Sequence, residues 1–428
     1  MSTPAVSPTP RRRLVGLAPS KPLALVVLAA SVSVSGCAGV PRTTLEPVKE
    51  RVAGTRLVDM LVATTRAPSK VPGEVFDGRR GGEVSFDNVV VSVPPDSVRK
   101  PGEVIYPPQN PGDPARQFVA HKIEPLGLKG AIAWYDRVAG PKKRVLIFVH
   151  GFNNTYEDAI LRFAQISTDL PIEAAPVLFT WPSGGSVFDY LYDRDSANYS
   201  RDALETMIQQ ITDSPDVEEV TLLAHSMGGW LAMEAVRQLA IRNGGHVPKK
   251  LSNIILASPD IDVDVFVTQL NQIGEASRRI TIFTATDDVA LDVSRRIAGS
   301  DQRLGSIDIT RPFVRKALLQ RGIAAIDLSA ATSSDGLNHI NFADSPEMVT
   351  AIGERLAAGD DISGSHPGLA ETVGATALGA AQGVGSAIGA GLTAPVAVID
   401  PEARRRLGRQ FSRSGQAFAG SLRTATGR

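Results

Sequence analysis

The sequence predicts an α/β fold, a mostly parallel and doubly wound sheet with helices on both faces. From residue 144 onward, six short apolar runs alternate with helical patterns. The runs are apolar on both faces, which is typical of strands in a buried parallel sheet. They are VLIFV from Val145, PVLFT from Pro176, VTLLA from Val220, NIILA from Asn253, ITIFT from Ile280 and GIAAIDL from Gly322.

Helical patterns lie between these runs. Thr155 with Asp158 has the form of a capping box, and apolar residues then recur on one helical face as far as Leu170. Further helices are expected over residues 200–211, over 228–242, and from the Ser345-Pro346 pair to about residue 358. The alternation of strands and helices predicts one doubly wound α/β domain over residues 120–358, large enough to be a catalytic domain.

Residues 55–119 predict an N-terminal extension whose strands pack on that domain. Residues 55–64 and 83–95 have strand-like patterns, and Pro, Gly and Asn dominate from Pro94 to Pro114, which indicates a loop. The tail, residues 359–428, is rich in Gly and Ala and has no charge from Thr372 to Ile399. Its small-residue spacing allows membrane association, and a flexible low-complexity tail is the alternative interpretation.

The N-terminus has the form of a lipoprotein signal peptide over residues 1–36. Arg11–Arg13 supply a basic start, Leu23–Val34 an apolar stretch too short to span a membrane comfortably, and Gly36 precedes the chain's single cysteine, Cys37. This resembles a bacterial lipobox and makes Cys37 the lipidation site, followed by a linker over 37–54. A plain signal peptide or an uncleaved anchor is the alternative.

Three residues of catalytic type follow three of the predicted strands. Ser226 follows the third, the acidic pair Asp287-Asp288 follows the fifth, and His339 follows the sixth. Serine, acid and histidine in that chain order are typical of α/β-hydrolases, and open α/β sheets bind ligands at the carboxyl ends of their strands. Ser226 lies in AHSMG, a nucleophile-elbow pattern in which Ala224 replaces the first glycine.

Each residue type has a role in acyl transfer. His339 would take the proton of the Ser226 hydroxyl, and a carboxylate would orient and stabilise the imidazole. The oxyanion needs backbone donors, which we expect to be the N–H groups of Met227 and, in the loop HGFNN, of Phe152. His225 and His150 are interpreted as local structural residues. The sequence has no cluster with metal-ligand spacing and no phosphate-binding glycine loop, so no metal or cofactor is expected.

The segments VHGFNNTYEDA, FTWPSGG, AHSMGGWL and TDDVAL resemble the DUF900 family of bacterial α/β-hydrolases, which is esterase- or lipase-like. TTRAP (Thr64–Pro68) and VSVP (Val91–Pro94) match elements upstream, so the resemblance covers residues 57–356. The family pattern places the acid two residues before Ala-Leu, which implies Asp288. Asp287 remains an alternative, as does Asp260 after the fourth strand.

These observations favour a serine hydrolase that cleaves carboxylic esters and is anchored by lipid in the bacterial envelope. The expected location is the outer membrane, on the side that faces the periplasm. An amidase or peptidase with the same triad, and a non-catalytic envelope lipoprotein that uses the fold as a binding module, are the alternatives. The expected partners are an acyl ester, the membrane, and another copy of the chain through the tail. The balanced charge of 45 basic and 45 acidic residues argues against nucleic acid.

Overall fold

The computed structural model describes residues 45–138, 143–170, 172–299, 302–329 and 339. Cys37, the Gly/Ala-rich tail and the helix expected from Ser345 lie outside these residues. Within the described residues, no helix is long and apolar enough to cross a membrane.

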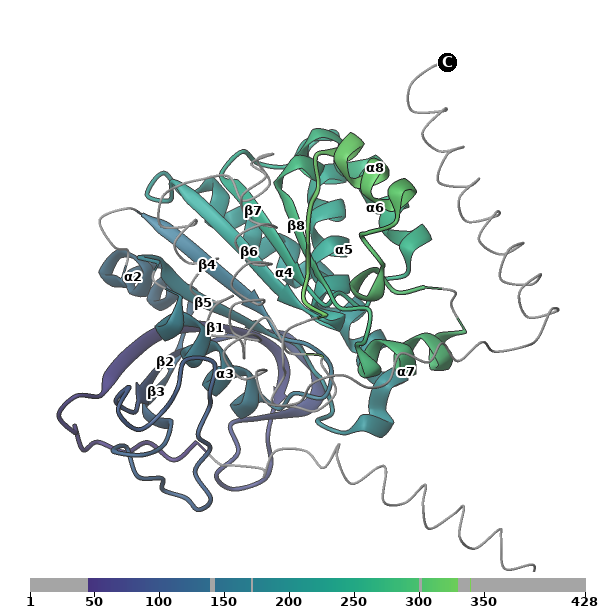
Figure 1. Cartoon of the computed structure of the whole chain (residues 1–428). Coiled ribbons are helices and arrows are strands. Elements are labelled where there is room, and N and C mark those ends of the chain that lie inside the picture. Colours follow the sequence, from purple (N-terminus) through teal and green to yellow (C-terminus); the bar gives the residue numbers. More distant parts are fainter. Residues whose placement is uncertain (1–44, 139–142, 171, 300–301, 330–338, 340–428) are drawn as a thin grey trace, which may run out of the picture. The chain divides into compact units, whose positions relative to one another are not determined.

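The described strands form one mixed sheet of nine strands in the order β3-β2-β1-β5-β4-β6-β7-β8-β9 (Figure 1). From β5 to β9 in this order all neighbours are parallel. The side chains of β4 to β8 are almost entirely buried, as the apolar runs predicted, whereas β9 is only partly buried. The strands of this part are β4 (Arg144–Val149), β5 (Ala175–Thr180), β6 (Glu219–His225), β7 (Leu251–Ala257), β8 (Ile280–Thr284) and β9 (Ala324–Asp327).

The N-terminal residues extend the same sheet. β1 (Arg56–Pro68) pairs in parallel with β5, and β2 (Phe76–Val93) and β3 (Val119–Leu126) add antiparallel strands beyond it. β1 and β2 are longer than the patterns over 55–64 and 83–95 indicated, and the domain boundary expected at residue 120 falls inside β3. The strands before residue 120 are therefore continuous with the sheet through the hydrogen bonds between β1 and β5.

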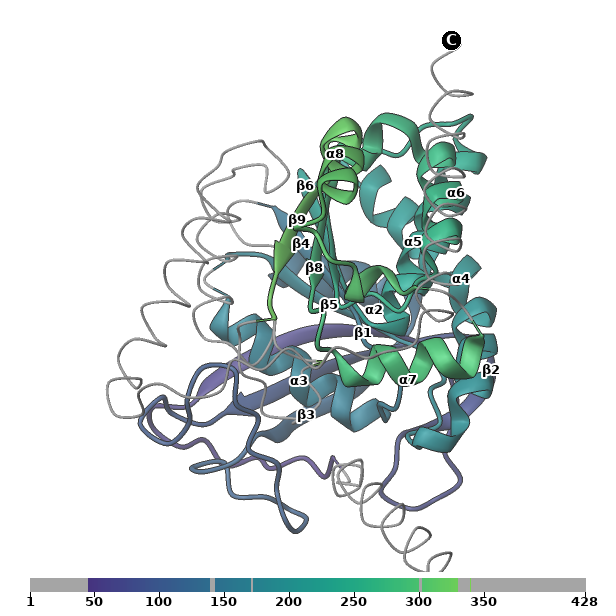
Figure 2. The same cartoon turned by 45° about the vertical axis from the view of Figure 1, so that its right-hand side comes forward.

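Helices cover both faces of the sheet, and the view in Figure 2 shows α3 on the opposite side from α5. One core lies under α2, α4, α5 and α6, and a second lies under α3, where Phe163 stacks on Phe148 with ring centroids 5.4 Å apart. The helices are α2 (Leu128–Val138), α3 (Tyr156–Asp169), α4 (Tyr190–Asp213), α5 (Met227–Arg242), α6 (Val263–Ile273), α7 (Val289–Ala298) and α8 (Pro312–Arg321).

The starts of α3 and α4 show where the local sequence was sufficient to predict the first turn of a helix and where it was not. Thr155 and Asp158 form the predicted capping box at the start of α3. α4 begins ten residues before the expected start at residue 200. Its first turns carry Ser196 and Ser200, whose side chains are buried in contacts with the N-terminal strands. Serine has only a modest helix propensity, so these tertiary contacts explain why the pattern did not reveal the first turns.

A buried ion pair joins the loop after β2 to the end of α3. The Arg99 Nη2 lies 2.5 Å from the Asp169 Oδ1, and the side chains of both residues are almost fully buried. Asp169 also accepts hydrogen bonds from the Gly102 N–H and the Gln165 amide. Removing one member of such a pair leaves an uncompensated charge in the interior.

We expect Arg99→Met to lower the free energy of unfolding by about 3–5 kcal/mol, because Asp169 loses its cation while it stays buried. Denaturant unfolding followed by circular dichroism measures this. Arg56→Met is the matched control, since Arg56 makes an exposed ion pair with Asp96 and should cost less than about 1 kcal/mol. Equal losses in the two variants would contradict a structural role for the buried pair.

Candidate active site

Ser226 lies at a sharp turn between β6 and α5. Its backbone has φ 52° and ψ −122°, an unfavourable conformation for a residue with a side chain. The turn is held by hydrogen bonds from the Ser226 N–H to the Ala257 carbonyl and from the Gly229 and Asp260 N–H groups to the Ser226 carbonyl. Such strain persists only where the surroundings enforce it, and it is the geometry of a nucleophile elbow.

Two glycines allow the loop after β4 to approach this turn. A Cβ on Gly228 would lie 2.2 Å from the His150 carbonyl oxygen, and a Cβ on Gly151 would lie 3.1 Å from the Ser226 Cβ. No larger residue fits at Gly228 without moving the backbone. The sequence identified Gly228 by its pattern, whereas the need for glycine at 151 follows from the fold.

The structure brings Ser226, His339 and Asp288 together. The His339 Nε2 lies 2.8 Å from the Ser226 Oγ, and the His339 Nδ1 lies 2.7 Å from the Asp288 Oδ2. With the Nδ1–H donating to the carboxylate, the Nε2 is free of hydrogen and accepts from the serine hydroxyl. Ser226 is 3% exposed, so the hydroxyl lies in a largely water-excluded site.

Asp288 is positioned by the helix that it begins. Its Oδ1 accepts a hydrogen bond from the Leu291 N–H and so caps α7, which leaves the Oδ2 for His339. Asp287 is exposed at the surface. Asp260 is buried and faces other groups, with Arg303 Nε 3.1 Å from its Oδ1 and the Tyr190 hydroxyl 2.9 Å from its Oδ2.

His225 packs against the imidazole of His339. The two ring centroids are 4.9 Å apart, and the His225 Nε2 lies 3.2 Å from the His339 carbonyl oxygen. Burial, with a further contribution from His339, holds the pKa of His225 well below its usual range. A neutral ring with Nε2–H donating to that carbonyl steadies the backbone of His339.

The two expected oxyanion donors belong to segments that adjoin Ser226. Met227 is the first residue of α5, and the first N–H groups of a helix have no partner within the helix. Phe152 follows Gly151, where an added Cβ would lie 3.1 Å from the Ser226 Cβ, and the Phe152 ring packs edge-on against Tyr190 with centroids 5.6 Å apart. The backbone at this loop is also constrained at Asn153, which has φ 58°.

His150 is bound into the loop that carries Phe152. Its Nδ1 lies 2.8 Å from the Gly151 carbonyl oxygen, and its Nε2 accepts from the Trp181 N–H at 3.1 Å. The Trp181 ring stacks on His150 at 5.0 Å and is fully buried, so it is a packing residue. Burial lowers the pKa of His150 to about 3, with a smaller contribution from the charge of Arg66, and the ring is neutral.

A buried polar cluster beside the loop was not predicted from the sequence. Arg66, at the end of β1, is 1% exposed, and Asp193 in α4 is fully buried. Asp193 accepts hydrogen bonds from the Ser183 hydroxyl at 2.5 Å and the Gly184 N–H at 2.8 Å. The signal for Arg66 in the sequence was the TTRAP element, Thr64–Pro68, which contains it.

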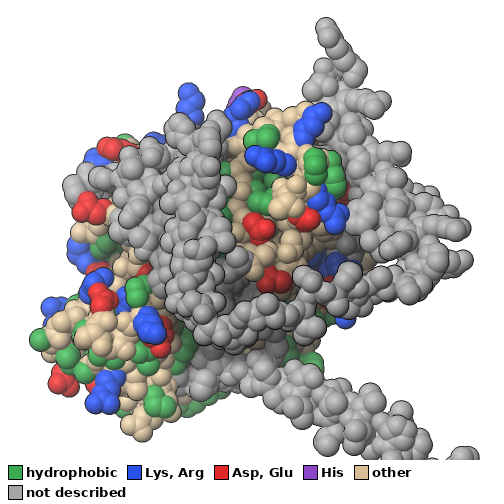
Figure 3. Space-filling view, viewed as in Figure 1, with side chains coloured by type: hydrophobic (Ala, Val, Ile, Leu, Met, Phe, Trp, Pro, Cys, Tyr) green, Lys and Arg blue, Asp and Glu red, His purple; other side chains and the backbone are tan. Residues whose placement is uncertain are grey.

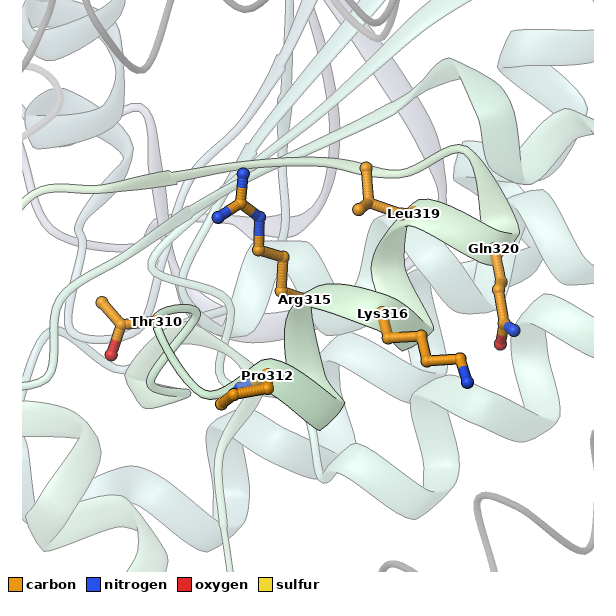
Figure 4. Close-up of a pocket in the computed structure, with 6 residues that line it drawn as sticks. All are labelled: Thr310, Pro312, Arg315, Lys316, Leu319 and Gln320. Carbon is orange, nitrogen blue, oxygen red and sulfur yellow. The ribbon is translucent and has the colours of Figure 1, made fainter.

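A surface groove of about 540 Å³ lies elsewhere, along α8 (Figure 4). None of the residues gathered around Ser226 lines it, so it is separate from the candidate active site. The groove is lined by Thr310, Pro312, Arg315, Lys316, Leu319 and Gln320.

Among the described residues no group of three or more His, Cys, Asp or Glu side chains could hold a metal. On the face of the molecule seen in Figure 3, basic and acidic side chains of the described residues are interspersed.

The parallel sheet, the strained serine between β6 and α5, and the order of serine, aspartate and histidine define an α/β-hydrolase. Residues 134–355, just over half of the chain, match the family described as an alpha/beta hydrolase of unknown function (DUF900). The chain belongs to this family.

Other similarities are more distant. An uncharacterised protein of Nostoc sp. (strain PCC 7120), alr1448, is 30% identical in an alignment 139 residues long that covers 26% of this chain and 35% of that protein. The chain thus spans about a third of the length of this relative. Two solved structures resemble the chain at a TM-score of 0.30: ESTFA in an Fe-lacking apo form, at 11% identity over 80% of this chain and 91% of that one, and an esterase from Rhizomucor miehei, at 12% over 76% and 89%.

The buried carboxyl of Asp193 makes stability depend on pH. Burial raises the pKa of Asp193 to about 6, and the hydrogen bonds from Ser183 and Gly184 only partly oppose the shift. The folded state therefore binds a proton that the unfolded state releases near pH 4. This contribution to stability is complete below about pH 4 and is lost as the pH rises through 6.

Relative to Asp193→Asn, we expect wild type to lose about 2–3 kcal/mol of unfolding free energy between pH 4 and 7. Urea unfolding at a series of pH values measures the difference. Asp195→Asn, an exposed residue of the same helix, should keep the pH dependence of wild type. A constant difference between wild type and Asp193→Asn across this range would show that Asp193 does not titrate there.

Proposed function

We propose that this protein is a serine hydrolase that cleaves carboxylic esters through an acyl-enzyme intermediate. One observation carries the proposal: a strained, buried serine lies 2.8 Å from an imidazole that is itself 2.7 Å from a buried carboxylate. A serine hydroxyl is a weak nucleophile until a positioned base removes its proton. A complete set of nucleophile, base and orienting acid has no purpose in a module that only binds.

The reaction would proceed in two halves. The Ser226 Oγ attacks the ester carbonyl carbon while the His339 Nε2 takes the hydroxyl proton, and Asp288 stabilises the imidazolium. The N–H groups of Phe152 and Met227 stabilise the oxyanion. When the intermediate collapses, His339 gives the proton to the leaving alcohol, and a water molecule then repeats the sequence to release the acid.

The chain around the site favours short or exposed acyl groups. Between Asp260 and the start of β8 the structure contains only α6 and the short 3-10 segment Gly274–Arg279, and it has no large insertion there. The proposed preference is therefore for esters that do not need a deep cover. Amide hydrolysis passes through the same oxyanion, so esters and amides must be compared directly.

Labelling with a fluorophosphonate probe tests the nucleophile. We expect the full-length protein to be labelled, Ser226→Ala to lose labelling, and His339→Ala and Asp288→Asn to react about 10³–10⁴ times more slowly. Asp287→Asn is the matched control for the acid, because it neutralises the exposed neighbour and should react like wild type. Folded wild type that does not react would overturn the proposal and leave a binding module as the function.

We also propose that lipid on Cys37 attaches the protein to the bacterial envelope, at the outer membrane facing the periplasm. The support is the basic start, the apolar stretch and Gly36-Cys37 in the sequence. More than one acyl chain anchors a protein stably where a single chain does not.

In a bacterial host supplied with an alkyne analogue of palmitate, we expect wild type to incorporate label and to sediment with membranes. Cys37→Ser should lose the label and move to the soluble fraction, because the chain has no other cysteine. Ser35→Ala is the control, since it alters the same segment and keeps the acceptor thiol. Label retained in Cys37→Ser, or absent from exported wild type, would refute lipidation.

A further inference from the structure

The guanidinium of Arg66 is buried among backbone carbonyls of two loops at the candidate active site. The Nη2 donates to the Asn154 carbonyl at 2.7 Å, and the Nη1 donates to the Ser183 carbonyl at 2.9 Å and to the Asp77 carbonyl at 3.4 Å. Arg66 therefore joins the end of β1 to the loops that follow β4 and β5. Arg99, buried to a similar degree, is instead paired with a carboxylate.

The third side of the guanidinium begins a chain of hydrogen bonds. The Arg66 Nε donates to the Thr180 Oγ1 at 2.9 Å, and this hydroxyl lies 3.0 Å from the His150 Nε2. The Thr180 oxygen accepts from the arginine, so its own proton is available to the neutral Nε2 of His150, an acceptor that Thr180 shares with the Trp181 N–H at 3.1 Å. The His150 Nδ1–H then donates to the Gly151 carbonyl at 2.8 Å.

The last bond of this chain fixes the direction of the Phe152 N–H. The Gly151 carbonyl and the Phe152 N–H belong to one planar trans peptide group, so they point in opposite directions. Holding the carbonyl toward His150 holds the N–H away from it. The same loop is tied a second time, since the Asn154 side-chain amide donates to the Phe152 carbonyl at 2.8 Å while Arg66 holds the Asn154 carbonyl.

We propose that Arg66 is a positioning residue for the oxyanion donor Phe152, acting through Thr180, His150 and the Gly151 carbonyl. This inference rests on the proposed function. It also makes β1 part of the catalytic apparatus, although Arg66 lies outside the residues 134–355 that match the family. The charge of Arg66 contributes as well as its shape, because hydrogen bonds from a charged donor to carbonyl oxygens are stronger than those from a neutral donor.

Arg66→Met and Thr180→Val test the proposal in the full-length protein. Preorganised oxyanion donors act mainly in the transition state, so we expect kcat for p-nitrophenyl acetate to fall about 10-fold to 100-fold while KM changes less than about twofold. Arg66→Lys should be intermediate, because one ammonium cannot reach four divergent acceptors. Methylguanidine should partly restore kcat in Arg66→Ala.

The matched controls are Arg99→Met and Thr212→Val. Arg99 is a buried arginine, and Thr212 is a buried threonine whose hydroxyl bonds to carbonyls within α4. Both should melt at lower temperature yet keep the kcat of wild type while folded. If Arg66→Met does not fold, Thr180→Val carries the test, because it preserves shape and removes only the hydroxyl.

The outcomes separate the inference from the proposed function. Wild type that reacts with fluorophosphonate, together with folded Arg66→Met and Thr180→Val that keep the kcat of wild type, would overturn the inference alone. A fall of the same size in Arg99→Met would also overturn it, because the effect would then be general destabilisation. Folded wild type that does not react would overturn the proposed function itself.

Discussion

The close approach of the loop after β4 to the turn at Ser226 is the constraint on which the site depends. Gly228 and Gly151 are the two points of contact, and a Cβ on Gly228 would lie 2.2 Å from a backbone oxygen. This approach brings the loop that carries Phe152 next to the serine that precedes Met227. It also keeps Ser226 in a strained conformation, because the loop, α5 and β7 leave the turn no room to relax.

The polar groups behind this loop are arranged to resist rearrangement. Burial of Arg66 lowers its pKa to about 10, which leaves the guanidinium charged at neutral pH, and the nearest acids are only partly compensating. Burial also raises the pKa of Glu157, in the first turn of α3, to about 7. A cation that is already satisfied by carbonyls keeps its geometry when such neighbours change protonation, because those carbonyls do not titrate. The bond from Arg66 to the Asn154 carbonyl is thus independent of the titration of these acids, although the same loop also meets Asp193 through the Asn153 N–H at 3.5 Å.

Much of the fold could be predicted from sequence, because the strands from β4 to β8 are buried on both faces and their pattern is almost purely apolar. β3 was missed because its alternating and largely exposed residues do not resemble such a strand. The choice between Asp287 and Asp288 depends on which side chain caps α7, a property of the loop conformation. The role of Arg66 could not be found, since its partners Asn154 and Thr180 are distant in sequence and are met only through the pairing of β1 with β5.

Three buried arginines show how the type of acceptor decides the role of a cation. Arg99 and Arg303 face carboxylates, Asp169 and Asp260, and each such pair neutralises itself and fastens two segments at one point. Arg66 faces backbone carbonyls from separate loops, so its hydrogen bonds fix the course of the chain rather than one side chain. Arg66 acts on the expected donor indirectly, because the Gly151 carbonyl, whose peptide group carries the Phe152 N–H, is held by His150. A buried arginine without a carboxylate partner is therefore consistent with a role in shaping backbone at the site, whereas the paired arginines serve stability.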